Sequence, residues 1–265
     1  MIKQGKKILK LSIRQSKTLA KNILIKVKKI PEEPIFIVGC GHSGTSIMLA
    51  MLDSHSQLYG VPYESRIFVN SKSKTDTLYQ MLLWSQKAKI NKKKRWVEKT
   101  PYHIYYLHEI FSIAPKAKVI AMLRDGRDVA CSIKARTGSV DHGIQNWLKS
   151  CEVLLNYSDD SRVFIVKLED LVANPENELR KVTSFLGEEY ESEMLNYHLV
   201  ERRYYSREIK KVEDVSGKNH EIYRTWQINQ PLMKNTARYA TELKSEEIEQ
   251  CEEYLHEYLK RFSYI

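Results

Sequence analysis

The chain has 265 residues, of which 42% are hydrophobic and 29% are charged. This composition is typical of a globular protein and excludes a disordered chain, a collagen and a disulfide-rich scaffold. The ten glycines and seven prolines do not cluster into a linker, so we predict one folded domain with terminal additions. The four cysteines are widely spaced and form no C-x-x-C pair, which favours neither a zinc site nor a disulfide-stapled fold.

The formal net charge of +10 is concentrated at the start of the chain. Residues 1–31 contain ten of the 43 basic residues and no acidic residue, which leaves 33 basic against 33 acidic side chains in the remainder. A surface that follows a nucleic-acid backbone would need positive charge on the folded body. We therefore expect no nucleic-acid partner, and we divide the chain into a basic N-terminal segment, residues 1–33, and one domain, residues 34–265.

The basic segment has the pattern of an amphipathic helix. One side of a helical wheel carries Ile8, Leu9, Ile13, Leu19, Ala20, Ile23, Leu24, Val27 and Ile30, and the other carries Lys3, Lys6, Lys7, Lys10, Arg14, Lys17, Lys21 and Lys28. Such a helix lies well at an anionic membrane surface, although docking on its own domain is an alternative. The segment is too charged to contain a signal-peptide core, and no stretch is apolar enough to span a bilayer. We expect a cytoplasmic protein that attaches peripherally to a membrane through residues 1–30.

Short runs of β-branched and aromatic residues alternate with helical patterns along the domain. In chain order we predict a strand at 35–38, helices at 44–52 and 76–90, a strand at 95–98, a helix at 102–113, a strand at 118–123, helices at 127–136 and 141–157, a strand at 162–166, and helices at 175–186 and 246–262. The helix at 175–186 is best marked, with Asn174 as N-cap, Pro175 at its first position and Gly187 after its end. Strands that alternate with helices predict an α/β fold with a mostly parallel sheet covered on both faces.

A glycine-rich loop joins the first predicted strand to the first predicted helix. Residues 39–46 read Gly-Cys-Gly-His-Ser-Gly-Thr-Ser, the frame of a Walker A loop with Thr45 in the place of its lysine. The glycines let the backbone turn so that several N–H groups and the helix N-terminus face one anionic group. The loop therefore predicts a phosphate ligand, and a glycine-rich turn without a ligand is the alternative.

A second position argues against a magnesium nucleoside triphosphate. The strand predicted at 118–123 is followed by Arg124, where the aspartate that holds Mg²⁺ would be expected. Because both the loop lysine and this aspartate are missing, ATP with Mg²⁺ is a poor fit to the sequence.

Together these motifs resemble those of the sulfotransferases that use 3′-phosphoadenosine 5′-phosphosulfate (PAPS). The loop residues similar to the family's 5′-phosphosulfate loop are Gly41, His42, Ser43, Gly44, Thr45 and Ser46. Residues 123–132 resemble its 3′-phosphate motif, an arginine at a strand end, Arg124, and a serine eight residues later, Ser132. Residues 166–171, 174–175 and 185–187 resemble the segment that closes the family core, and similarity at 238–239 is weaker. The resemblance implies a P-loop-like three-layer sandwich with a central β-sheet flanked by helices, PAPS as co-substrate, and no metal.

Two further motifs are closest to the membrane-associated branch of the family, which sulfates glycans and protein tyrosines. Residues 51–55, Met-Leu-Asp-Ser-His, lead to Glu64, where this branch has an acidic residue near the acceptor. Residues 98–101, Glu-Lys-Thr-Pro, resemble its catalytic lysine motif. Two positions depart from the family pattern, because His42 replaces a usual Lys or Arg and Leu168 replaces a frequent Tyr.

The resemblance implies three catalytic side chains. Glu64 would be the general base that takes the proton of the acceptor hydroxyl. Lys99 would stabilise the negative charge that grows on the bridging oxygen, and His42 could share this task. Each also has a plainer interpretation: a solvated loop carboxylate for Glu64, a surface lysine for Lys99 and a loop-stabilising side chain for His42.

Arg124 and Ser132 would hold the 3′-phosphate, the arginine by its forked guanidinium and the serine by its hydroxyl. The plainer interpretation is that Arg124 pairs with Asp125 or Asp128 in a helix cap.

The function predicted from the sequence is transfer of a sulfuryl group from PAPS to a hydroxyl, in line, with a glycan or glycolipid as the expected acceptor. One alternative is a nucleotide or small-molecule kinase of P-loop type. Another is a non-catalytic, membrane-docked module that binds an adenosine phosphate.

Overall fold

The structure is a computed structural model of the chain, and it describes residues 33–71, 73–200 and 225–265. The amphipathic helix predicted at residues 1–30, with the membrane contact expected of it, lies outside the described residues. Within the described ranges, no helix is both long enough and apolar enough to cross a membrane.

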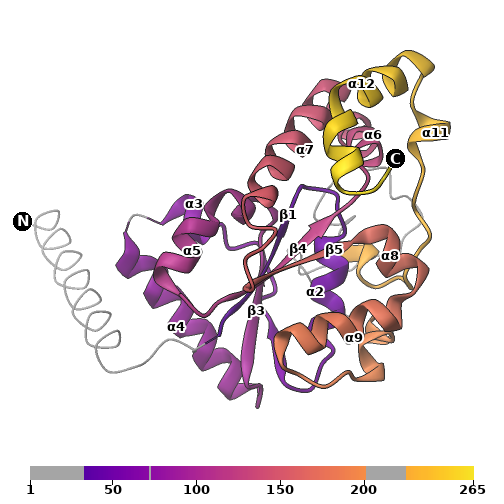
Figure 1. Ribbon diagram of the computed structural model, residues 1–265. Helices are drawn as coiled ribbons and strands as arrows, with labels where there is room; N and C mark the ends of the chain where they lie inside the picture. The colour runs from indigo at the N-terminus through magenta and orange to yellow at the C-terminus, as the bar shows by residue number, and fades with distance from the viewer. Residues whose placement is uncertain (1–32, 72, 201–224) are drawn as a thin grey trace, which may run out of the picture.

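Five parallel strands form one sheet at the centre of the domain (Figure 1). They are β1 (Ile35–Gly39), β2 (Leu58–Gly60), β3 (Arg95–Lys99), β4 (Lys118–Leu123) and β5 (Val163–Lys167), in the order β2-β3-β1-β4-β5. All four pairings are parallel, which confirms the predicted α/β class. The four predicted strands are present. The short strand β2 was not predicted, because three residues are too few to show an alternating pattern.

Two layers of helices cover the faces of the sheet and complete the three-layer sandwich. One layer contains α4 (Lys74–Ile90), α5 (Leu107–Ile113), α6 (Gly126–Thr137), α7 (Val140–Leu155) and α12 (Ser245–Arg261), and the other contains α2 (Thr45–Asp53), α8 (Leu168–Ala173) and α9 (Pro175–Leu186). Figure 1 shows α8 and α9 on the opposite side of the sheet from α4 and α5. Each face has its own apolar core, with Phe36 and Trp96 in one and Ile37 and Val97 in the other, as the alternation of strand side chains requires.

The helix ends follow their sequence signals where these are strong. The side chain of Asn174 accepts a hydrogen bond from the N–H of Asn177, Pro175 begins α9, and Gly187 ends it with a left-handed φ of 71°. The predicted helix at 102–113 begins instead as a 3₁₀ helix, η1 (Pro101–Tyr106), and continues as α5. The remaining short elements were not predicted: α3 (Ile67–Asn70), η2 (Ser192–Met194), η3 (Tyr197–Leu199) and α11 (Tyr239–Glu242), together with α8.

Because every strand runs in the same direction, all the carboxyl ends meet at one edge of the sheet. The three central strands β3, β1 and β4 end there at Lys99, Gly39 and Leu123. In open α/β sheets this edge is where ligands bind, at the point where the strand order reverses. The reversal here lies at β1, whose neighbours are β3 and β4.

Candidate active site

The predicted phosphate loop bends sharply as it leaves β1. Gly39 has a φ of +145°, and a Cβ there would lie 2.2 Å from the carbonyl oxygen of Met122 on β4. Gly44 has a φ of +84°, and a Cβ there would lie 2.7 Å from Cδ1 of Leu168. Both positions need glycine, because their φ is left-handed and because any side chain would collide with a neighbouring residue.

The loop ends at the N-terminus of α2, where Thr45 and Ser46 are buried. The first N–H groups of a helix have no partner inside the helix, so this end is suited to an anion. Ser43 is fully buried, and its Oγ has no hydrogen-bond partner among the described residues. Because an unpaired buried hydroxyl destabilises a fold, this atom beside a helix N-terminus fits a ligand that carries phosphate or sulfate oxygens.

Two other loop residues have roles that the sequence left open. His42 is half-buried with a left-handed φ of 70°, and its carbonyl oxygen accepts a hydrogen bond from Nη1 of Arg124 at 3.2 Å. This bond joins the loop to the end of β4. Burial raises the pKa of the Cys40 thiol to about 12, so the thiol is protonated at neutral pH and is not a nucleophile.

Arg124 follows β4 directly and is almost fully buried. Its Nη1 lies 3.4 Å from Oγ of Ser132, and its Nη2 lies 3.0 Å from Oδ2 of Asp128. Arg124 therefore lies beside Ser132 and also makes the alternative ion pair with Asp128. The Nε of Arg124 is buried and has no partner among the described residues, so the guanidinium retains a donor for an anion.

A C-terminal segment, residues 235–239, packs onto this arginine. The Nη2 of Arg124 donates to the carbonyl of Asn235 at 2.5 Å. Asp128 accepts from the N–H of Ala237 at 2.9 Å and from the N–H of Tyr239 at 3.0 Å. The sequence did not predict this closure, since its only signal there was the weak similarity at 238–239.

Lys99 and Glu64 form an ion pair at the end of β3. Lys99 is fully buried, and its Nζ lies 2.7 Å from Oε1 of Glu64, whose side chain is 18% exposed. Burial excludes the surface-lysine interpretation, and the contact excludes a merely solvated carboxylate. Because a buried charge must be paired, the position of each group depends on the other.

Two polar residues of the motif at 51–55, Asp53 and His55, join elements of the fold. Oδ1 of Asp53 accepts from the N–H of Gly60 at 2.7 Å, which joins α2 to β2. Nε2 of His55 lies 2.8 Å from the carbonyl oxygen of Glu189, just beyond α9. The motif therefore links α2 to β2 and to the segment after α9.

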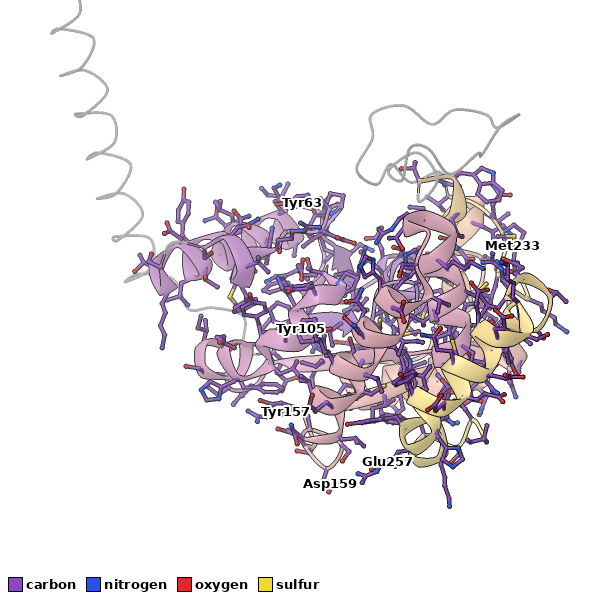
Figure 2. All side chains as sticks on the ribbon, turned by 90° about the horizontal axis from the view of Figure 1, so that it is seen from above. Tyr63, Tyr105, Tyr157, Asp159, Met233 and Glu257 are labelled. Atoms are coloured by element: carbon purple, nitrogen blue, oxygen red, sulfur yellow. The ribbon has the colours of Figure 1, made fainter. Side chains whose placement is uncertain are left out.

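The parts of the site lie side by side along the edge of the sheet. Lys99 ends β3, the loop follows β1, and Arg124 follows β4, and these three strands are neighbours. Adjacent strands are about 4.8 Å apart, so the strand ends span about 10 Å. In Figure 2, which views the molecule from above, Tyr63 marks the Glu64 side of the site and Met233 marks the side of the 235–239 segment. The two residues lie well apart, so they mark opposite sides of the site.

This arrangement defines a class of protein: a P-loop-like α/β domain that has an anion-binding loop, a buried lysine–glutamate pair on one side of it and a buried arginine on the other. In the described part of the chain, no group of three or more His, Cys, Asp or Glu side chains is placed to hold a metal ion.

Comparison with known proteins narrows this class. The model of the Sulfotransferase family matches residues 70–192, a range that includes Lys99, Arg124 and Ser132. A protein-tyrosine sulfotransferase of Drosophila melanogaster is 27% identical over 198 residues, which cover 62% of this chain and 40% of that protein. Protein-tyrosine sulfotransferase A of Caenorhabditis elegans is 23% identical over 201 residues, which cover 62% of this chain and 52% of that protein. The chain thus spans about half the length of these two relatives.

The fold agrees with the sequence comparison. The crystal structure of mouse sulfotransferase SULT7A1, complexed with 3′-phosphoadenosine 5′-phosphate (PAP), superposes with a TM-score of 0.58 at 14% identity. The superposition covers 89% of this chain and 86% of that one. The chain therefore has the fold of a sulfotransferase, and residues 70–192 match the Sulfotransferase family.

Proposed function

We propose that the chain transfers a sulfuryl group from PAPS to the hydroxyl of an acceptor. The observation that carries the proposal is the order of groups along the sheet edge. The carboxylate of Glu64 and the buried Lys99 meet at the end of β3, the glycine-rich loop follows β1, and buried Arg124 with Ser132 follows β4. This order matches a donor with a transferable sulfate at one end of a nucleotide and a 3′-phosphate at the other.

The residues proposed to hold the donor are those of the loop and of the β4 end. The N–H groups of 41–46, with the hydroxyls of Ser43, Thr45 and Ser46, would bind the 5′-phosphosulfate. Arg124 and Ser132 would bind the 3′-phosphate through charge-assisted hydrogen bonds. The buried Ser43 Oγ and Arg124 Nε, both without partners among the described residues, fit the two anionic groups.

PAPS supplies the sulfuryl group: the bond from sulfur to the 5′-phosphate oxygen breaks as a bond from sulfur to the acceptor oxygen forms. Glu64 accepts the proton that the acceptor hydroxyl loses. Lys99, fully buried at the end of β3, stabilises the negative charge on the bridging oxygen of the departing phosphate. His42, a residue of the loop, would assist Lys99 as a donor.

The acceptor proposed from the sequence is a carbohydrate or glycolipid hydroxyl. The relatives named above are protein-tyrosine sulfotransferases, so a tyrosine hydroxyl is the competing acceptor and belongs in the same assay. In both cases the reacting group is a hydroxyl whose proton Glu64 removes. Attachment to an anionic membrane through residues 1–30 is proposed separately, because it does not depend on the acceptor.

Donor binding tests this proposal first. PAP should raise the melting temperature without Mg²⁺, whereas ATP with Mg²⁺ should have little effect because the loop has Thr45 in the place of a lysine. Labelled PAPS is then supplied with a panel of glycans, glycolipids and tyrosine peptides. Transfer to at least one hydroxyl supports the enzyme. Stabilisation by ATP with Mg²⁺ alone would favour the kinase alternative, and PAP binding without transfer to any acceptor would favour the non-catalytic module.

A further inference from the structure

A fully buried carboxylate, Glu98, lies directly before Lys99 on β3. Successive strand residues point to opposite faces of the sheet, so Lys99 shares a face with α2 and the phosphate loop, and Glu98 shares the other with Trp96. The strand therefore presents a cation on one face and an anion on the other at the same place. No catalytic role was assigned to Glu98 from the sequence.

Glu98 collects hydrogen bonds from the loop that carries Glu64. Its Oε1 accepts from the N–H of Ser65 at 3.1 Å, from Oγ of Ser65 at 2.8 Å and from Oγ1 of Thr100 at 2.6 Å. Its Oε2 lies 3.1 Å from Nδ1 of His103, which is also fully buried. One carboxylate thus gathers four contacts without exposure to solvent.

Both hydroxyls in this network also hold backbone N–H groups of the loop. Oγ1 of Thr100 accepts from the N–H of Arg66 at 3.3 Å, and Oγ of Ser65 accepts from the N–H of Ile67 at 3.3 Å. The N–H groups of three consecutive residues, 65–67, are therefore fixed by Glu98 or by a hydroxyl bound to it. Arg66 has a left-handed φ of 48°, an unfavourable backbone conformation for a residue with a side chain, so the loop needs such restraints.

Two consecutive residues of β3 thus bind two consecutive residues of the loop before α3. Lys99 holds Glu64, and Glu98 holds Ser65. The hydrogen-bond partners of Glu98 among the described residues are Ser65, on the loop that carries Glu64, and Thr100 and His103, which follow β3.

We propose that Glu98 is a positioning residue for sulfuryl transfer: through Ser65 and Thr100 it fixes the loop so that the Glu64 carboxylate meets the acceptor hydroxyl. This inference rests on the proposed function of Glu64. The charged state of Glu98 agrees with it. Burial alone raises the pKa of this carboxyl, but His103 and the hydroxyl donors of Thr100 and Ser65 outweigh burial and hold the pKa below its usual value.

A double-mutant cycle between Glu98→Gln and Glu64→Gln tests the inference. Glu98→Gln keeps the size of the side chain but removes its charge, and charge-assisted hydrogen bonds are about twice as strong as neutral ones. We expect kcat to fall by about 10²-fold, the cost of misplacing a catalytic group by about 1 Å, while the Kd for PAP stays unchanged. In the Glu64→Gln background, adding Glu98→Gln should cause no further loss, because the base that it positions is already gone.

The outcomes separate this inference from the proposed function. If Glu64→Gln alone retains the wild-type rate, the proposed base is wrong, and the positioning role falls with it. If Glu64→Gln lowers the rate but the two losses multiply in the double mutant, the base stands and the positioning role of Glu98 is wrong. A Glu98→Gln variant with an unchanged kcat would also overturn the inference.

A second variant and a control show whether a loss of activity comes from misfolding. Ser65→Ala removes one hydroxyl of the network but leaves the buried carboxylate, so it should lower kcat less than Glu98→Gln and show the same lack of additivity with Glu64→Gln. Glu178→Gln alters another buried glutamate, on α9, that pairs with Lys181. This control should leave kcat and the Kd for PAP unchanged. If Glu98→Gln does not fold, the Ser65→Ala cycle decides the question alone.

Discussion

The Nζ of Lys99 lies 2.7 Å from Oε1 of Glu64, so the two proposed catalytic groups are in direct contact. Lys99 is fully buried, whereas the Glu64 side chain is 18% exposed, which leaves the carboxylate as the member that an acceptor can approach. The proposed base and the cation proposed to stabilise the leaving oxygen are therefore held together at the end of β3.

This contact has a consequence for mutational work. Removing either partner takes away the ion-pair contact of the other, so part of any loss in activity reflects the disturbed partner. Glutamine also removes the charge of Glu64, but it keeps the size of the side chain and an oxygen that can accept from Lys99, so it disturbs the contact less than alanine does.

Arg124→Ala should weaken PAP binding about ten- to a hundredfold, because a charged hydrogen-bond partner contributes about 1.5–3 kcal/mol. The loss should be confined to the 3′-phosphate. The Kd for adenosine 5′-phosphosulfate, which lacks that phosphate, should therefore change much less, and calorimetry on both ligands measures the difference. Arg180→Ala on α9, whose side chain is exposed and pairs with Glu176, is the matched control and should affect neither ligand. Equal losses for both ligands would mean that Arg124 supports the fold and does not recognise the 3′-phosphate.

Glu98→Gln should destabilise the protein in a pH-dependent way. The folded pKa of Glu98 lies below the ordinary value near 4.5, so its charged form stabilises the fold above about pH 4.5, and this contribution is lost as pH falls through the folded pKa. The gap in urea midpoint between wild type and Glu98→Gln should therefore be widest near neutral pH and narrow below about pH 4.5. A gap that stays constant as the solution is acidified would show that the Glu98 charge does not stabilise the fold.

Deletion of residues 2–30 should abolish pelleting with anionic liposomes. The basic amphipathic pattern of this segment is the motivation, and the remaining body has equal numbers of basic and acidic residues. PAP should still raise the melting temperature of the shortened protein, because the proposed donor site lies wholly in the folded domain. Equal pelleting of the full and shortened chains would refute the membrane contact and leave docking on the domain as the alternative.

The fold could be predicted from the sequence where local signals are strong. The strands β1, β4 and β5 contain continuous runs of apolar residues, and Asn174, Pro175 and Gly187 define the ends of α9. The short elements β2 and α3 have too few residues for a periodic pattern, and tertiary hydrogen bonds fix them instead. The N–H of Arg66, at the start of α3, bonds to Thr100, which is distant in sequence.

Part of the site could also be predicted, where its residues lie close together along the chain. Arg124 lies between β4 and α6, and Ser132 lies in α6 only eight residues later, so the short spacing in sequence favours their contact. The contact of Lys99 with Glu64, the hydrogen bonds from the loop to Glu98 and the closure by residues 235–239 join segments that are far apart along the chain. Sequence spacing has no bearing on such contacts, because the order of strands in the sheet determines them.

The most direct test of the account is a single-turnover assay with bound labelled PAPS and saturating acceptor, comparing wild type with Glu64→Gln. Glutamine keeps the size and polarity of the side chain, so PAPS affinity should stay near that of wild type. The rate of transfer should fall by about 10²–10⁴-fold, the usual contribution of a positioned base. Transfer at the wild-type rate would contradict the account, because another group would then have to remove the proton of the acceptor.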